Sequence, residues 1–271
     1  YTYTWSNAET TEDLNEIGAG TYSVIVADEN GCSIETSVEI TEPEGMVLSE
    51  THSDYTGYGV SCFGEADGAI DVTVSGGSGG YTYLWSSGQI TEDLENIPAG
   101  NYTLTVTDSN GCEQSISVEI TQTDEMEISE TYSDYTGYGV SCFGETDGEI
   151  DVTVNGGTGN YTYTWSNGET TEDLNNLGAG TYSVIVADEN GCSVETSIEI
   201  TQTDEMEISE NLSNYTEFGV SCFGYTDGEI DVTVNGGTGN YTYTWSNGET
   251  TEDLNEIGAG TYNVIVADEN G

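Results

Sequence analysis

An 80-residue internal repeat is the feature that most constrains how this chain can fold. The string Tyr-Thr-Tyr-x-Trp starts at Tyr1, Tyr81, Tyr161 and Tyr241, so the spacing is the same each time. Three periods and 31 further residues account for all 271 residues, and the sequence begins in the middle of a repeat. A strict repeat of this length predicts a tandem array of similar small domains. We expect the chain to be a piece of a longer array.

Comparison of the copies shows which residues each repeat keeps. Residues 81–111 differ from residues 161–191 at 13 of 31 positions. The shared positions hold apolar anchors and turn residues, among them Tyr81, Tyr83, Trp85, Gly88, Leu94, Gly100, Tyr102, Val106, Asp108, Asn110 and Gly111. They contain no set of acids, bases or ligands that could form a catalytic site. The unrepeated His52, Ser53 and Asp54 are consecutive and cannot form a triad on a strand, so we expect no enzyme.

The charge of the chain excludes several classes of partner. There are 51 Asp and Glu residues, one His, and no Lys or Arg, for a formal net charge of −51. Nucleic-acid binding needs cations to neutralise phosphates, and docking on an anionic membrane needs them too. No apolar run approaches the 18 residues of a membrane span, so we expect no membrane insertion. High charge at low hydropathy often marks disorder, but 19 Tyr, 4 Trp and 36 Gly with 2 Pro suit strands and tight turns.

Alternating apolar residues predict the strands of one repeat. The alternating stripes fall within residues 46–48, 70–74, 81–85, 102–106 and 116–120. Gly76–Gly80 is predicted to be a hairpin loop, and Asp108–Gly111 a turn that leads into another strand. Six or seven short strands in about 80 residues predict an all-β fold of tandem immunoglobulin-like antiparallel β-sandwich repeats, arranged as an elongated rod.

The linkers divide this array into four modules. Boundaries are expected near Pro43 and at the two copies of Thr-Gln-Thr-Asp, which begin at Thr121 and Thr201. The resulting modules are a partial one at 1–42, complete ones at 43–122 and 123–202, and a partial one at 203–271.

Three strings within each period resemble a known family. They are Cys142-Phe-Gly-x-x-Asp-Gly-x-Ile-Asp-Val-Thr-Val-x-Gly-Gly, Tyr161-Thr-Tyr-Thr-Trp-Ser-Asn-Gly, and Gly180-Thr-Tyr-Ser-Val-Ile-Val-x-Asp-x-Asn-Gly-Cys192. Together they are similar to the SprB repeat of the giant cell-surface adhesins of gliding Bacteroidetes. The resemblance implies an extracellular, cell-surface filament that is exported by type IX secretion and takes part in gliding motility. Related repeats also occur in surface proteins of non-gliding relatives.

Two functions follow from the residues and this resemblance. The first is a structural stalk or filament segment of a large secreted adhesin, whose partners are neighbouring repeats of the same chain. The alternative is a polysaccharide-binding, lectin-like repeat module. Surface polysaccharide and other filaments are the further candidate partners.

Two cysteines per period in an acidic, strand-rich array indicate disulfides formed outside the cell. A zinc site is the rival interpretation, but no Cys-x-x-Cys pair exists. Three pairings remain open: Cys62 with Cys112 within a module, Cys32 with Cys62 across a linker, and Cys62 with Cys192 between neighbouring modules. We favour the pairing within a module because each small core needs a staple. The candidates are Cys32, Cys62, Cys112, Cys142, Cys192 and Cys222.

Clustered carboxylates make Ca²⁺ the candidate cation, because it is bound by several oxygen ligands. The competing interpretation is a solvated acidic face that is screened by diffuse cations. No twelve-residue calcium-loop motif is present. The candidate ligands are Asp67, Asp71, Asp147, Glu149, Asp151, Asp227, Glu229 and Asp231.

Aromatic residues fall into two groups. One tryptophan per repeat is predicted to anchor the core: Trp5, Trp85, Trp165 and Trp245. A second group lies in the Gly-rich stretch before the second strand and is predicted either to pack at an interface or to form an adhesive strip: Tyr55, Tyr58, Tyr135, Tyr138, Tyr215 and Phe218.

Overall fold

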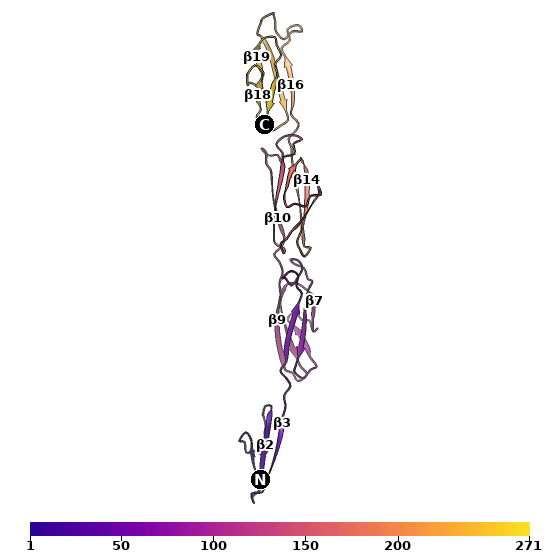
Figure 1. Cartoon of the computed structure of the whole chain (residues 1–271), viewed down its shortest axis with the longest axis vertical. Helices are drawn as coiled ribbons and strands as arrows, with labels where there is room; N and C mark the ends of the chain where they lie inside the picture. The colour runs from indigo at the N-terminus through magenta and orange to yellow at the C-terminus, as the bar shows by residue number, and fades with distance from the viewer. The chain divides into compact units, whose positions relative to one another are not determined.

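The computed structural model describes residues 1–271, and all of its regular elements are β-strands (Figure 1). No helix in it is long and apolar enough to cross a membrane. Its contacts divide the chain into two compact units. The first comprises residues 1–54, 58–60 and 65–121, and the second comprises residues 55–57, 61–64 and 122–271.

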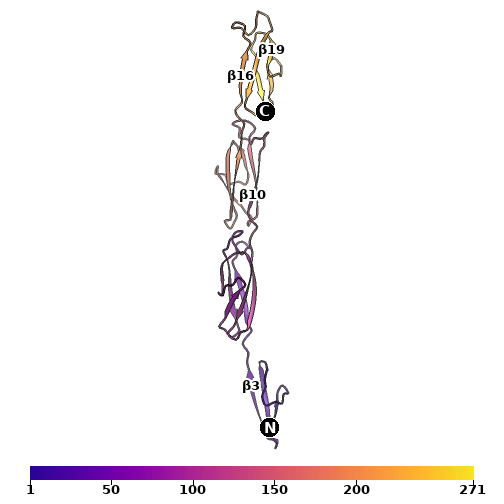
Figure 2. The same cartoon turned by 180° about the vertical axis from the view of Figure 1, so that it is seen from behind.

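The first unit contains a lone sheet and a complete sandwich. The lone sheet is formed by β1 (Thr2–Trp5), β2 (Gly20–Ala27) and β3 (Ser33–Ile40), and Figures 1 and 2 show that no second sheet covers it. Two further antiparallel sheets have the strand orders β4-β5-β7 and β6-β8-β9. Their strands are β4 (Val47–His52), β5 (Gly68–Ser75), β6 (Thr82–Trp85), β7 (Leu94–Ile97), β8 (Gly100–Thr107) and β9 (Glu113–Ile120).

The second unit repeats this topology. One pair of sheets has the orders β10-β11-β13 and β12-β14-β15, and a second pair has β16-β17-β19 and the two-stranded β18-β20. The first pair uses β10 (Glu127–Tyr132), β11 (Gly148–Asn155), β12 (Thr162–Trp165), β13 (Leu174–Leu177), β14 (Gly180–Ala187) and β15 (Ser193–Ile200). The second uses β16 (Glu207–Leu212), β17 (Gly228–Asn235), β18 (Thr242–Trp245), β19 (Leu254–Ile257) and β20 (Val264–Ala267). The predicted all-β, immunoglobulin-like sandwich class is confirmed.

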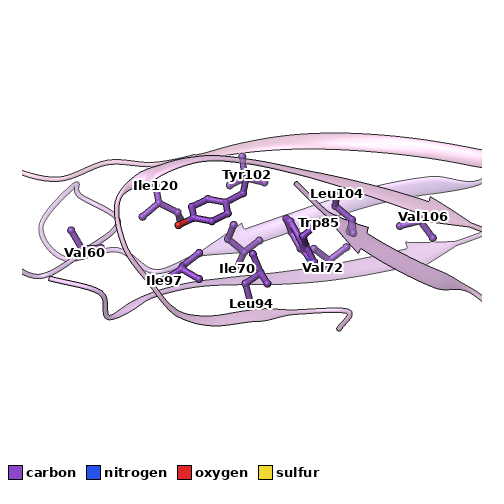
Figure 3. Packing of buried hydrophobic residues seen from close by; sticks show 11 residues of the cluster. Val60, Ile70, Val72, Trp85, Leu94, Ile97, Tyr102, Leu104, Val106 and Ile120 are labelled. Carbon is purple, nitrogen blue, oxygen red and sulfur yellow. The ribbon is translucent and has the colours of Figure 1, made fainter. Parts of the chain in front are cut away.

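The apolar stripes of the two sheets meet in one core per sandwich. Figure 3 shows Ile70 and Leu94 of one sheet pointing toward Trp85 and Leu104 of the other. The indole nitrogen of Trp85 donates a hydrogen bond to the carbonyl of Thr91 at 2.9 Å, so its polar atom has a partner inside the core. Trp165 and Trp245 donate to the carbonyls six residues downstream in the same way.

The tryptophans differ in burial according to whether a second sheet faces them. Trp85, Trp165 and Trp245 are only 1–3% exposed. Trp5 is part-buried, because the sheet of β1, β2 and β3 has no facing sheet. Each core also contains a tyrosine hydroxyl that donates to a carbonyl four residues upstream, as Tyr102 does to Pro98 at 2.8 Å. This contact resembles the tyrosine corner of immunoglobulin-like sandwiches.

Two local expectations need correction. Gly76–Gly80 is not a hairpin loop, because β5 pairs with β4 and β7 while β6 pairs with β8 in the other sheet. The chain therefore crosses between sheets there. Strand β7 was not among the predicted stripes, because its two buried residues, Leu94 and Ile97, are three apart. Asn96 between them has a φ of 55°, and the register with β5 shifts beside it.

Two leucines on neighbouring strands test this core. Leu104 is fully buried, whereas Leu84 is 57% exposed. We expect Leu104→Ala to lower the free energy of unfolding of its sandwich by about 2–5 kcal/mol, from lost burial plus the cavity. Leu84→Ala should change it by less than about 0.5 kcal/mol. Urea unfolding, with hydrogen exchange of the β8 amides as the local readout, measures both; equal effects would contradict the assigned core.

Candidate inter-repeat crosslink site

A buried aspartate shapes the turn between β14 and β15. Asp188 is only 6% exposed. Its Oδ1 accepts hydrogen bonds from the backbone amides of Asn190 and Cys192, at 3.0 and 2.9 Å. Its Oδ2 accepts from the backbone amide and the hydroxyl of Thr158, both at 3.0 Å. These four bonds satisfy the carboxylate and fix the direction in which Asn190 and Cys192 leave the turn.

Asn190 contacts a loop that comes from the preceding 80-residue repeat. Its side-chain amide donates to the carbonyls of Tyr55 and Ser61, at 3.2 and 3.1 Å. Its side-chain oxygen accepts from the hydroxyl of Thr56 at 3.2 Å. Residues 55–57 and 61–64 belong to the same compact unit as Asn190, so these contacts lie within one unit.

Thr56 is strained at this contact. Its φ of 51° is uncommon for a β-branched residue, which pays a steric cost in the left-handed region. The hydroxyl of Thr56 also donates to the carbonyl of Tyr55 at 2.8 Å. The strained turn thus places a carbonyl and a hydroxyl together where Asn190 can bridge them.

A disulfide closes the same contact. Cys62 is bonded to Cys192, with Cα atoms 5.6 Å apart and a sequence separation of 130 residues. The pairing that we favoured, Cys62 with Cys112, is therefore wrong, as is the pairing of Cys32 with Cys62. The free thiols are Cys32, Cys112, Cys142 and Cys222.

The length of β9 explains why the pairing within a module fails. Cys112 comes directly before β9, whereas the loop of Cys62 lies at its far end, where the amide of Gly59 donates to the carbonyl of Thr121 at 2.9 Å. An eight-residue strand spans roughly 26 Å. A disulfide requires Cα atoms within about 7 Å, so these two cysteines cannot meet.

The aromatic residues of the Gly-rich stretch lie in this loop and its copies. Tyr55, Tyr58, Tyr135 and Tyr138 are half-buried. Tyr135 and Tyr138 exchange two backbone hydrogen bonds, which close a tight turn. In the last copy Tyr215 and Phe218 are 39% and 70% exposed. The first two copies thus hold their tyrosines within the loop rather than presenting them as an open strip.

The carboxylates singled out for Ca²⁺ do not converge. No group of three or more His, Cys, Asp or Glu residues could hold a metal ion. Strand alternation exposes Asp71, Glu149, Asp151, Glu229 and Asp231 on the solvent face. Asp147 and Asp227 instead accept hydrogen bonds from the amides of Ser141 and Ser221, both at 3.0 Å. These contacts hold the pKa of both aspartates below its ordinary value. Asp67 is part-buried before β5.

Sequence reasoning missed the two polar residues that make the contact, Asn190 and Thr56. The available signal was the string Asp-x-Asn-Gly-Cys, which recurs after the penultimate strand of each repeat. Asn110 and Asn190 are retained although the residue before them changes from Ser109 to Glu189. A turn explains the glycine and the aspartate, and the retained asparagine side chain was left without a role.

These features define a class of protein: tandem antiparallel sandwiches in which one repeat is bonded covalently to the next. The family model of the SprB repeat matches residues 60–90, 140–170 and 220–250. The expected resemblance is confirmed, and the chain carries three SprB repeats. Together with the disulfide, they indicate a structural repeat module of an extracellular surface protein. No curated protein sequence matches the chain.

Several solved structures resemble parts of the chain. A C-terminal 282-residue fragment of intimin, in complex with the intimin-binding domain of its translocated receptor, is 12% identical, with a TM-score of 0.29 over 69% of this chain and 59% of that one. The N-terminal eight Ig domains of Down syndrome cell adhesion molecule are 13% identical, with a TM-score of 0.29 over 100% of this chain and 44% of that one. At such TM-scores the likeness carries no argument, and the fold rests on the strand pairing.

The equivalent aspartate of the first unit gives a pH prediction. Asp108 accepts from the amide and hydroxyl of Ser78 and from the amides of Cys112 and Asn110. The backbone amide of Ser78 is the largest cause, with that of Cys112 next, and together the contacts lower the pKa of Asp108 to about 2.

A depressed pKa in the folded state stabilises the fold above the unfolded pKa of about 4, and this stabilisation is lost as pH falls toward 2. We expect Asp108→Asn to lower the melting temperature at pH 6, and the difference from wild type to shrink steadily between pH 4 and pH 2. Comparing the two proteins at each pH cancels the general relief of acidic repulsion. A difference that stays constant down to pH 2 would contradict the assigned role.

Proposed function

We propose that this chain is a structural stalk or filament segment of a large secreted cell-surface adhesin. The observation that carries the proposal is the contact of Asn190 and Cys192 with the loop of residues 55–62. It joins two successive repeats by three side-chain hydrogen bonds and one covalent bond. A protein that must transmit load along a tandem array needs strong links between its repeats as well as within them.

The SprB repeats support the same proposal and extend it. The proposed modules are 1–42, 43–122, 123–202 and 203–271, with export by type IX secretion and a part in gliding motility as the biological setting. The acidic surface fits this role, because 51 carboxylates without Lys or Arg keep neighbouring filaments apart and soluble.

The disulfide has a direct mechanical consequence. A force applied to the two ends of the chain passes through the sulfur atoms of Cys62 and Cys192. The residues between them are then bypassed, and the 130-residue separation cannot be extended while the bond holds. The bond therefore limits how far the stalk can lengthen when its sandwiches unfold.

Single-molecule stretching tests this proposal. Chain contributes about 3.3–3.6 Å per residue when extended, so reduction should add roughly 450 Å to the contour length of the fully unfolded protein. We expect the oxidised wild-type chain to show the short length and the reduced chain the long one.

Matched serine variants provide the controls. Cys62→Ser should show the long contour in both redox states, because no bypass can form. Cys112→Ser should behave like wild type. Equal contour lengths for oxidised and reduced wild type would contradict a load-bearing bond between repeats.

A further inference from the structure

The loop that receives Asn190 occurs three times, and the three copies differ in what occupies them. Residues 55–62 hold both an asparagine and a disulfide. Residues 135–142 hold an asparagine and a free thiol, Cys142. Residues 215–222 hold neither, and Cys222 is exposed and free.

The second copy reproduces the polar half of the crosslink. The side-chain amide of Asn270 donates to the carbonyls of Tyr135 and Ser141, at 3.4 and 2.9 Å. The hydroxyl of Thr136 lies 3.3 Å from the same nitrogen. Every one of these contacts has its counterpart 80 residues earlier, around Asn190. Asn270 and residues 135–142 belong to the same compact unit.

The turn that carries Asn270 also has the same geometry as the turn that carries Asn190. Asp268 is only 7% exposed and accepts from the amides of Asn270 and Thr238, at 3.1 and 3.0 Å. Gly191 and Gly271 both have a φ of 87°. The backbone therefore leaves the two turns in the same direction, and in the first of them the next residue is Cys192.

The third copy shows that the loop forms without its asparagine. Thr216 keeps a φ of 51°, close to those of Thr56 and Thr136. Tyr215 and Phe218 still exchange two backbone hydrogen bonds, and Ser221 still donates to Asp227. The strained turn is thus built into the loop, and the contact surface exists before a partner arrives.

The spacing of the cysteines accounts for which thiols are free. Cys62 is the only cysteine with another cysteine 130 residues after it within the 271 residues, and that cysteine is its partner. A cysteine 130 residues after Cys142 would come directly after Gly271. The same spacing places the partners of Cys32, Cys112 and Cys222 outside the chain.

We propose that Cys142 is a second disulfide acceptor, specific for a cysteine that directly follows the Asp268–Gly271 turn. Asn270 is the positioning residue, because it seats the turn on the loop before the sulfur atoms react. The inference goes beyond the stalk role and does not depend on it.

The bond forms by thiol–disulfide exchange with a small-molecule disulfide such as oxidised glutathione. One cysteine thiolate attacks this disulfide and becomes a mixed disulfide, which releases one glutathione thiolate. The other cysteine, once deprotonated, attacks the protein-bound sulfur and releases the second glutathione thiolate. Two protein thiols are oxidised by two electrons, and one glutathione disulfide is reduced to two thiols.

The test adds one cysteine to the chain after Gly271 and incubates the protein with a buffer of oxidised and reduced glutathione. Cleavage at Glu without reduction, followed by mass spectrometry, identifies the partner of the added cysteine. We expect it to be Cys142, with the bond of Cys62 to Cys192 unchanged. A predominant bond of the added cysteine to Cys112 or Cys222, or its persistence as a glutathione adduct, would overturn the proposal.

Two variants separate positioning from chance collision. Asn270→Ala in the extended chain should slow formation of the bond by about tenfold, since hydrogen bonds to two carbonyls are lost. Asn110→Ala is the matched control, because it alters the equivalent residue of another turn, and should leave the rate unchanged. A chain extended by serine reports whether the addition disturbs the fold, by its melting temperature. An unchanged rate in Asn270→Ala would refute the positioning role.

Discussion

The buried carboxylates of Asp108, Asp188 and Asp268 are the interaction on which the rest of the structure depends. With no Lys or Arg in the chain, an aspartate inside the fold has no cationic side chain of that kind to pair with. Each instead accepts hydrogen bonds from backbone amides and from a serine or threonine hydroxyl. Hydrogen bonds to an ionised acceptor are stronger than neutral ones, so a polyanionic chain can keep a charge inside. The outer carboxylates remain in solvent.

The same hydrogen bonds connect the fold to the junction between repeats. Because Asp188 holds the amides of Asn190 and Cys192, the turn presents both side chains in a fixed geometry. The receiving loop is equally prepared, by the strained Thr56 and by hydrogen bonds within its own repeat. Two preformed surfaces lose little conformational freedom when they meet, which favours both the hydrogen bonds and the disulfide. A stalk built this way depends on its junctions as much as on its cores.

Sequence patterns predicted the parts of the fold that depend on local alternation. The stripes at Ile70–Val74 and Tyr102–Val106 became β5 and β8, and the Asp108–Gly111 turn joins β8 to β9. Sequence did not reveal that residues 76–80 cross between sheets, because glycines allow both a hairpin and a crossover. The crosslink was also missed: Cys62 and Cys192 are 130 residues apart, and only the three-dimensional path of β9 separates Cys62 from Cys112.

The most direct test of the central claim, that one repeat is bonded covalently to the next, is peptide mapping of the purified chain without reduction. Free thiols are alkylated first, and the protein is then cleaved at Glu and Asp, since it has no Lys or Arg. The account predicts one crosslinked pair, Cys62 with Cys192, and alkylated Cys32, Cys112, Cys142 and Cys222. A predominant peptide that joins Cys62 to Cys112 would contradict it.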